Sequence, residues 1–214
     1  MRVDIWSDVV CPWCYVGKAR FEKALTGFAH RDQVEVVYRS FELDPTPRPA
    51  GRRQKVLEML SEKYGMSLAD ARQAEDHVAG LARAEGLGYD SQRPVGNTFD
   101  LHRVLQHARE KGVQHELLVA IYQAYFAEGR EIFDIPVVTE IAAGAGLDAG
   151  TVGNILENSD LYADAVKRDE QEAGQLGITG VPFFVFDMAL GVSGAQATDT
   201  FTHALTQAWD RTAA

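Results

Sequence analysis

The N-terminal part of the chain carries three hydrophobic patterns in succession. VDIW (3–6) is a short apolar run typical of a strand. From Cys14, apolar residues recur every three or four positions, which predicts a helix with one buried stripe of Cys14, Gly17, Phe21, Leu25 and Phe28. QVEVVYRSFEL (33–43) is rich in β-branched and aromatic residues on both alternating faces, which predicts an inner strand. The opening therefore predicts a βαβ unit.

The middle of the chain has a helical pattern. DPTPRP (44–49) holds three of the seven prolines and predicts a stiff linker. Beyond it, helical periodicity with glycines after the ends predicts six helices: 51–64, 67–85, 98–111, 114–128, 135–143 and 148–157. The residues predicted to cap helix starts are Ser67, Asn97 or Thr98, Asp134 and Asp148. No strand pattern and no repeat interrupts this region.

Strand patterns return only near the C-terminus. A helix with a charged face is predicted at 161–177, where glycine closes it, and the near-continuous apolar run 178–187 predicts a second inner strand. A tight turn at Asp187–Met188 leads to a short strand at 189–194, and an amphipathic helix follows at 198–209. The predicted order is β-α-β, a helical block, then α-β-β-α.

Composition and charge exclude two classes of partner. The 214 residues are 46% hydrophobic and 24% charged, an ordinary globular composition. The net charge is −10 without a compensating Lys/Arg run, which argues against binding of nucleic acid. The longest apolar runs, such as VPFFVF, are too short to span a membrane. Because MRVDIWSD lacks the apolar stretch of a secretory signal, we expect a cytoplasmic protein.

Both cysteines of the chain lie in DVVCPWCYVG (8–17). A bridge between them would close a very small loop and stabilise the fold little, so the pair favours a chemical role. At a helix start, unpaired amide N–H groups stabilise a thiolate, and we expect Cys11 to titrate below the usual value of about 8.5. Pro12 suits the first helical turn, and Cys14 lies one turn further along the apolar stripe. The pattern predicts Cys11 as an exposed attacking thiol and Cys14 as its partly buried resolving partner.

Other interpretations of these residues stay open. The pair could be half of a zinc site, but such a site needs two more ligands and the six histidines are scattered, so no metal is predicted. Two inert core cysteines are a second alternative. Asp8 is interpreted as a solvated loop residue rather than one that tunes the thiols. Trp13 serves either substrate contact or simple packing.

A proline, Pro182, lies within the predicted strand 178–187. Inside a central strand a proline would remove a ladder hydrogen bond, so Pro182 must lie where the strand begins. The Val181–Pro182 peptide bond is either cis, turning the chain, or an ordinary strand start.

Five motifs together resemble one known family. They are WSDVVCPWCYVG (6–17), SFELDP (40–45), GNTFDLHRVL (96–105), GITGVPFFVF (177–186) and VSGAQ (192–196). In this order, over essentially the whole chain, they resemble the FrnE-like subgroup of DsbA-type thioredoxin-fold oxidoreductases, which is related to 2-hydroxychromene-2-carboxylate isomerases and kappa-class glutathione transferases. The resemblance implies an α/β, thioredoxin-like fold interrupted by a large all-helical insertion, with its parts at 1–46, 47–157 and 158–214.

The resemblance also implies a site. Cys11 and Cys14 would be the redox pair, facing a cis Pro182, and Val181 would offer its backbone N–H and C=O to an extended peptide or a glutathione-like substrate. Asn97, with Thr98, matches residues that line the groove in relatives, although a helix cap explains it equally. Residues 193–196 match a further segment, but turn chemistry accounts for them and they are not counted as site residues.

Three functions compete. Isomerase relatives usually carry serine where this chain has Cys11 and bind glutathione as cofactor, so two thiols favour a thiol–disulfide oxidoreductase. In a glutathione-reduced cytosol, reduction or isomerisation of disulfides is the expected direction. The alternatives are a glutathione-dependent isomerase or transferase and a non-catalytic binding protein. No cofactor is expected to bind tightly, although glutathione could be the reductant or a ligand. Expected partners are thiol- or disulfide-containing proteins, peptides or small molecules. The acidic helical block could also carry the face of a homodimer, although the sequence does not determine the oligomeric state.

Overall fold

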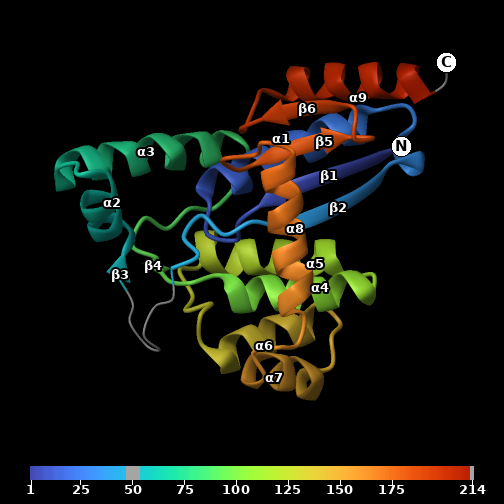
Figure 1. Cartoon of the computed structure of the whole chain (residues 1–214). Coiled ribbons are helices and arrows are strands. Elements are labelled where there is room, and N and C mark those ends of the chain that lie inside the picture. Colours follow the sequence, from blue (N-terminus) through green and yellow to red (C-terminus); the bar gives the residue numbers. More distant parts are fainter. Residues whose placement is uncertain (47–53, 213–214) are drawn as a thin grey trace. The chain divides into compact units, whose positions relative to one another are not determined.

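The computed structural model describes residues 1–46 and 54–212, and it contains two compact units (Figure 1). The first comprises Met1–Leu43 and Val166–Ala214, and the second comprises Asp44–Ala165. The division into domains at 1–46, 47–157 and 158–214 stays a prediction. Residues 47–49 of the predicted linker and 51–53 of the first predicted insertion helix lie outside the described residues.

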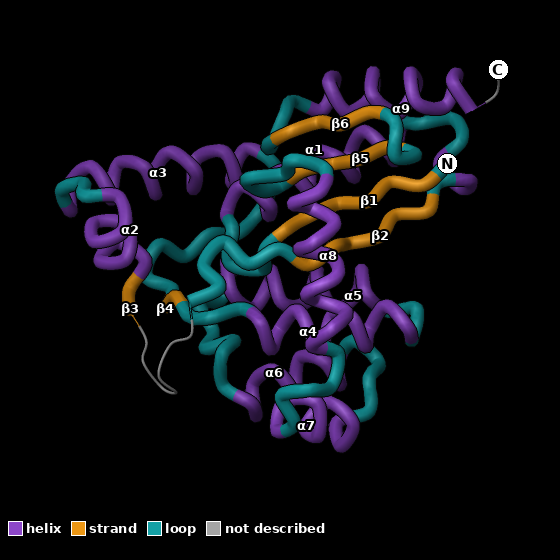
Figure 2. Tube along the Cα trace, in the orientation of Figure 1, coloured by secondary structure: helices purple, strands orange, loops and turns teal. Residues whose placement is uncertain are grey.

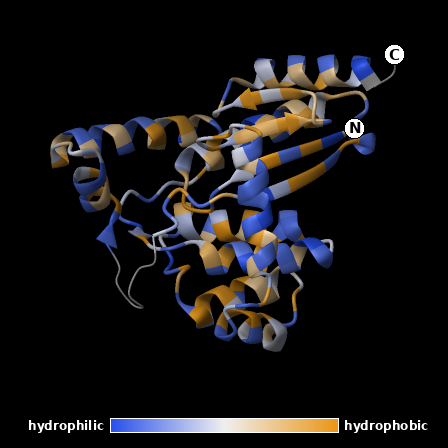
Figure 3. Cartoon of the chain, in the orientation of Figure 1, coloured by the Kyte–Doolittle hydropathy of each residue, from blue (hydrophilic) through white to orange (hydrophobic). Residues whose placement is uncertain are grey.

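A four-stranded sheet forms the centre of the first unit (Figure 2). Its strands, in the order β2-β1-β5-β6, are β2 (Glu35–Ser40), β1 (Arg2–Ser7), β5 (Phe183–Phe186) and β6 (Leu190–Ser193). Only the β1–β2 pair is parallel. β5 is an inner strand as predicted, and its hydrophobic colour is nearly continuous in Figure 3.

The prediction that 33–43 forms an inner strand is wrong. Within the described part of the chain, β2 lies at the edge of the sheet. Val37 and Tyr38 point to opposite faces and are both buried, at 5% exposure each. Hydrophobic residues at successive positions of a strand indicate that both faces of the sheet are covered there. They do not indicate whether the strand has a hydrogen-bonded neighbour on both of its edges.

Helices cover both faces of this sheet. On one face, α1 (Pro12–Gly27) and α9 (Thr198–Thr212) pack through a cluster of aromatic rings, where Phe21 lies 5.4 Å from Phe184 and 5.8 Å from Phe201 between ring centroids. On the other face, α8 (Ala163–Gln175) contributes Ala173 to a buried cluster with Trp6, Ile178 and Val185. A 3₁₀ turn, η1 (Arg31–Gln33), precedes β2.

A charged network holds α8 against the strands. Arg39 of β2 donates to Asp4 at 2.7 Å and to Asp169 of α8 at 2.8 Å. The Trp6 indole N–H donates to the Asp169 carbonyl at 2.8 Å, and the Ser40 amide donates to the Asp169 carboxylate at 2.9 Å. These bonds fix the carboxyl ends of β1 and β2, from which the cysteine segment and the 40–43 segment continue.

The second unit is mainly helical. Its helices are α2 (Val56–Tyr64), α3 (Leu68–Ala84), α4 (Phe99–Glu110), α5 (Gln114–Tyr122), the π-helical η2 (Gln123–Ala127), α6 (Ile135–Gly144) and α7 (Ala149–Glu157). The predicted caps of α3 and α7 are confirmed, because Ser67 and Asp148 accept the backbone N–H of Asp70 and Thr151. No helix among the described residues is both long and apolar enough to cross a membrane.

The prediction of a region without strands is wrong in one place. β3 (Gln54–Lys55) and β4 (Pro94–Val95) pair as a short antiparallel ribbon. Two residues are too few to produce the period of two that identifies a strand in a sequence, so this element depends on a contact between distant segments.

Candidate active site

The cysteine pair lies where β1 leads into α1. β1 ends at Ser7, and α1 begins at Pro12 with Cys11 as its N-cap residue, so the predicted helix start is confirmed. The Cys11 amide donates to the Asp8 carbonyl at 3.1 Å, which closes the turn between the two elements. Both cysteines are free thiols. Proline suits the first helical position because that position has no intrahelical acceptor for an N–H.

The two thiols are more buried than predicted. Cys14 is 1% exposed, and Cys11 is only 3% exposed, so the prediction of an exposed attacking thiol is wrong. The cause is a loop distant in sequence, because the Cys11 thiol donates to the Val181 carbonyl across 3.7 Å. Trp13 between them is the exposed member of the motif, at 39%.

Burial sets the protonation state of Cys14. Desolvation raises the pKa of its thiol well above the ordinary value, and the hydrogen bond and charge of Cys11 raise it further. The Asp8 backbone lowers this pKa and the Asp8 charge raises it, both with smaller effects. Cys14 therefore keeps its proton at neutral pH, which suits a thiol that reacts second.

The raised pKa of Cys14 predicts a loss of stability in alkali. A folded-state pKa above the unfolded value means that the unfolded chain loses this proton first, so the stabilisation is complete below about pH 8.5 and declines above it. For the reduced protein, the free energy of unfolding should fall above pH 8.5, with a slope approaching about 1.4 kcal/mol per pH unit from this thiol.

Urea unfolding at pH 7 to 10.5 under a reductant measures this slope. Tyr15 and Tyr38 have pKa values that burial raises as well, so they add a decline of the same sign. The matched comparison is Cys14→Ala, whose curve should be shallower by the contribution of the thiol. Parallel curves for the two proteins would contradict the assignment.

Asp8 is not the solvated loop residue that was predicted. It is 1% exposed, and its carboxylate accepts the Leu43 amide at 2.8 Å. The segment that follows β2 thus closes over the turn before Cys11. The sequence could not indicate this, because the partner of the carboxylate lies 35 residues away.

The loop before β5 completes the site. The Val181–Pro182 peptide bond is cis, and the Pro182 carbonyl accepts the Gly194 amide at 2.8 Å. Val181 also packs against the buried cluster around Trp6, which anchors the residue whose carbonyl faces Cys11. The structure thus brings Cys11, Val181 and Pro182 together.

Two site neighbours were missed by the sequence analysis. The segment 193–196, interpreted as a turn, lies against α1, where Arg20 donates to the Ala195 carbonyl at 2.9 Å. Gly17 of α1 lies so near Ala195 and Pro182 that a Cβ atom on it would be 3.3 Å from the Ala195 Cα and 3.0 Å from the Pro182 Cγ. The VSGAQ motif was the available signal for this segment.

Asn97 lies in the second unit, just before α4. Its side-chain oxygen accepts the Phe99 amide at 3.0 Å, and its side-chain nitrogen donates to the Asp44 carbonyl at 3.4 Å. These contacts are those of a residue that organises the start of a helix. A role of Asn97 in substrate binding stays a prediction.

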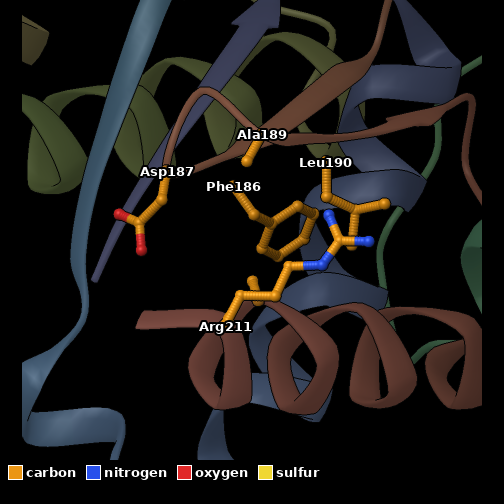
Figure 4. A pocket seen from close by; sticks show the side chains of 6 residues that line it. Phe186, Asp187, Ala189, Leu190 and Arg211 are labelled. Carbon is orange, nitrogen blue, oxygen red and sulfur yellow. The ribbon is translucent and has the colours of Figure 1, made fainter. Parts of the chain in front are cut away.

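A surface pocket lies at the other end of the β5–β6 hairpin (Figure 4). The Arg211 side chain extends along the Phe186 ring, and the Asp187 carboxylate points away from both. The strand register pairs Phe186 with Leu190 at this end and Phe183 with Ser193 at the Pro182 end, so the pocket is separate from the cysteines. Among the residues that the structure describes, no three His, Cys, Asp or Glu side chains are grouped as a metal site requires.

Comparison with known proteins identifies the family. The DSBA-like thioredoxin domain family matches residues 2–206, nearly the whole chain. The chain belongs to this family. The DsbA-type resemblance and the thioredoxin-like α/β fold are therefore confirmed, and the family is one of thiol oxidoreductases.

Several solved structures are similar to this DSBA-like chain. A "probable DsbA oxidoreductase" from Streptomyces coelicolor is 57% identical, with a TM-score of 0.94 over 98% of this chain and 90% of that one. The cytosolic disulfide reductase DsbM of Pseudomonas aeruginosa, solved with glutathione, is 19% identical, with a TM-score of 0.65 over 97% and 98%. A 2-hydroxychromene-2-carboxylate isomerase is 15% identical, with a TM-score of 0.72 over 100% and 98%. The last two share the fold.

Proposed function

We propose that the chain is a thiol–disulfide oxidoreductase of the FrnE-like subgroup, with Cys11 as nucleophile and Cys14 as resolving thiol. The observation that carries this proposal is the geometry at the start of α1. There two free thiols lie three residues apart, and the first of them meets the Val181 carbonyl at 3.7 Å. The disulfide of the oxidised form needs only these two sulfurs, which a helical spacing of three brings within reach.

The exchange runs in two displacements. The Cys11 thiolate attacks one sulfur of a substrate disulfide, which forms a mixed disulfide and releases the other substrate sulfur as a thiolate. Cys14 then gives up its proton and attacks the Cys11 sulfur, which releases the second substrate thiolate and leaves the Cys11–Cys14 disulfide. Two electrons pass to the substrate, and an external thiol of the glutathione class must restore the dithiol.

The surrounding residues have separate roles in this proposal. Cys11, at the N-cap of α1, is the attacking residue, while burial keeps the proton on Cys14 until the mixed disulfide has formed. Val181, beside Pro182, offers backbone groups to an extended peptide, in the manner of an added strand. Trp13 is exposed beside the cysteines and contacts the substrate. Asn97 of the second unit stays a predicted substrate contact.

The proposed direction is reduction or isomerisation of disulfides in the cytoplasm, with glutathione as the reductant and no tightly bound cofactor. The glutathione-containing structure of DsbM supports the choice of reductant through the shared fold. The similarity to 2-hydroxychromene-2-carboxylate isomerase makes a glutathione-dependent isomerase the second candidate. Two thiols favour exchange, because an isomerase has no use for a resolving cysteine.

The variant Cys14→Ser separates these candidates. Without a resolving thiol, the mixed disulfide cannot collapse, so incubation with an oxidised peptide should leave a covalent adduct on most of the protein, detectable by intact-mass spectrometry. The wild type should show none at the same time point, and reductant should release the adduct. If Cys14→Ser forms no adduct with peptide or glutathione disulfide and keeps full isomerase turnover, the oxidoreductase proposal fails.

A further inference from the structure

A very close contact joins α1 to the loop that carries Pro182. Gly17 is a buried residue of α1, three positions beyond Cys14. A Cβ atom on residue 17 would lie 3.0 Å from the Pro182 Cγ, 3.3 Å from the Ala195 Cα and 3.4 Å from the Ala195 Cβ. Carbon atoms prefer separations of about 3.5–4.0 Å, so any side chain here would push the loop away from the helix.

The neighbours of Gly17 cannot easily move aside. One is a proline ring and the other is the Cα and Cβ of an alanine, and neither is the end of a flexible side chain. The Pro182 carbonyl accepts the Gly194 amide at 2.8 Å, and the Ala195 carbonyl accepts a hydrogen bond from Arg20 of α1 at 2.9 Å. A shift of either segment would therefore stretch these bonds or move both segments together.

Helix stability does not explain this glycine. Glycine loses more conformational freedom on folding than alanine and weakens a helix interior. Alanine would therefore be favoured at residue 17 if the space allowed it. The close approach of the Pro182 loop and of Ala195 is what requires a residue without a side chain.

Both partners of the close approach at Gly17 are joined through the chain to residues at the Cys11 thiol. Cys11 is the N-cap residue of the helix that contains Gly17, and Val181 precedes the proline whose ring a Cβ on residue 17 would meet at 3.0 Å. The Cys11 thiol donates to the Val181 carbonyl across 3.7 Å. We propose that Gly17 is a positioning residue for thiol–disulfide exchange, whose missing side chain sets the distance between the Cys11 sulfur and the Val181 carbonyl. This inference rests on the proposed function of the same site.

The hydrogen bond between the Cys11 thiol and the Val181 carbonyl determines how a side chain at residue 17 should shift the redox equilibrium of the cysteine pair. A thiol can donate to the Val181 carbonyl, and a disulfide sulfur cannot, so the contact stabilises only the reduced form. A wider gap should favour the disulfide, with the equilibrium constant for oxidation by glutathione disulfide rising about threefold, or about 14 mV. A change that merely loosened the fold would act on both redox forms alike and leave this constant unchanged.

The experiment compares Gly17→Ala with the wild type and with Gly27→Ala. Gly27 is the last residue of α1, and a Cβ there would meet nothing within 4 Å, so the same substitution is made in the same helix without the contact. Two quantities are measured: the equilibrium constant in glutathione buffers, by thiol counting, and the rate of Cys11 alkylation by iodoacetamide in the reduced protein. Both should rise about threefold in Gly17→Ala only. Wild-type values in Gly17→Ala, or equal changes in Gly27→Ala, would overturn the inference.

The same measurements distinguish an error in the oxidoreductase proposal from an error in the role of Gly17. A wild-type protein that forms no Cys11–Cys14 disulfide would refute the oxidoreductase, while the alkylation comparison would still decide whether Gly17 positions the loop.

Should Gly17→Ala fail to fold, Arg20→Gln removes the hydrogen bond to the Ala195 carbonyl without adding an atom at the contact. Its Cys11 alkylation rate should rise about twofold, and a wild-type rate would overturn the inference.

Discussion

Replacing Cys11 by serine should lower kcat/KM for the reduction of a peptide disulfide by at least about 10³-fold. A serine hydroxyl is not ionised at neutral pH and forms no stable bond to the substrate sulfur, so the first displacement is lost. Cys14 cannot replace it, because burial raises the pKa of this thiol well above the ordinary value and keeps it protonated. Turnover is measured with a fluorescence-quenched peptide disulfide and glutathione as the reductant.

The control for Cys11→Ser is its stability. Serine has nearly the shape of cysteine, and its hydroxyl can still donate to the Val181 carbonyl, so the free energy of unfolding should change by only about 1 kcal/mol. Loss of activity at nearly unchanged stability assigns the effect to chemistry. Turnover within tenfold of the wild type would exclude Cys11 as the nucleophile and remove the basis of the proposed mechanism.

Replacing Glu75 by alanine should destabilise the second unit by about 3–5 kcal/mol. Arg93 is 1% exposed and donates to the Glu75 carboxylate at 2.8 and 3.2 Å. The guanidinium also lies over the rings of Tyr89, at 4.6 Å, and Phe126, at 4.9 Å. Removal of the carboxylate leaves a buried charge without its anion, and neither the rings nor the Asp90 carbonyl, at 2.9 Å, can neutralise it. Urea unfolding monitored by circular dichroism measures the loss.

A double variant tests the cause of this loss. Glu75→Leu combined with Arg93→Met replaces both charges by apolar groups, so no buried ion remains unpaired. Because burying a charge pair is itself costly, the double variant should be more stable than Glu75→Ala by about 2 kcal/mol or more. If the double variant is the less stable protein, the pair contributes mainly through its packing and hydrogen bonds, and the explanation by an unpaired charge is wrong.

Local patterns in the sequence predicted most of the elements and the position of the cysteines. The helix stripe from Cys14, the caps at Ser67 and Asp148 and the turn at Asp187–Met188 all depend on residues within a few positions of one another. Both residues of that turn have positive φ, at 46° and 53°. These features could be predicted because each depends on the types of residues that are close together in the sequence.

The errors have the opposite origin. The edge position of β2 depends on which strand lies beside it, and the ribbon of β3 and β4 on the meeting of segments about 40 residues apart. The burial of Asp8 depends on Leu43, and that of Cys11 on Val181, 170 residues further along. No local pattern distinguishes a loop that another segment covers from one that water covers.

By itself, the sequence determined the strand–helix junction, the two thiols at its helix start and the proline before β5, because each is a choice of residue at one point in the chain. The family resemblance already implied that the cysteines face Pro182. Only the tertiary structure decided that the Cys11 thiol is buried against the Val181 carbonyl, that Cys14 is buried enough to keep its proton, and that Gly17 lets the loop lie close to α1. The reason is physical. Desolvation and close packing are properties of atoms that folding brings together from distant parts of the chain, and they act over a few ångströms in space whatever the separation in sequence.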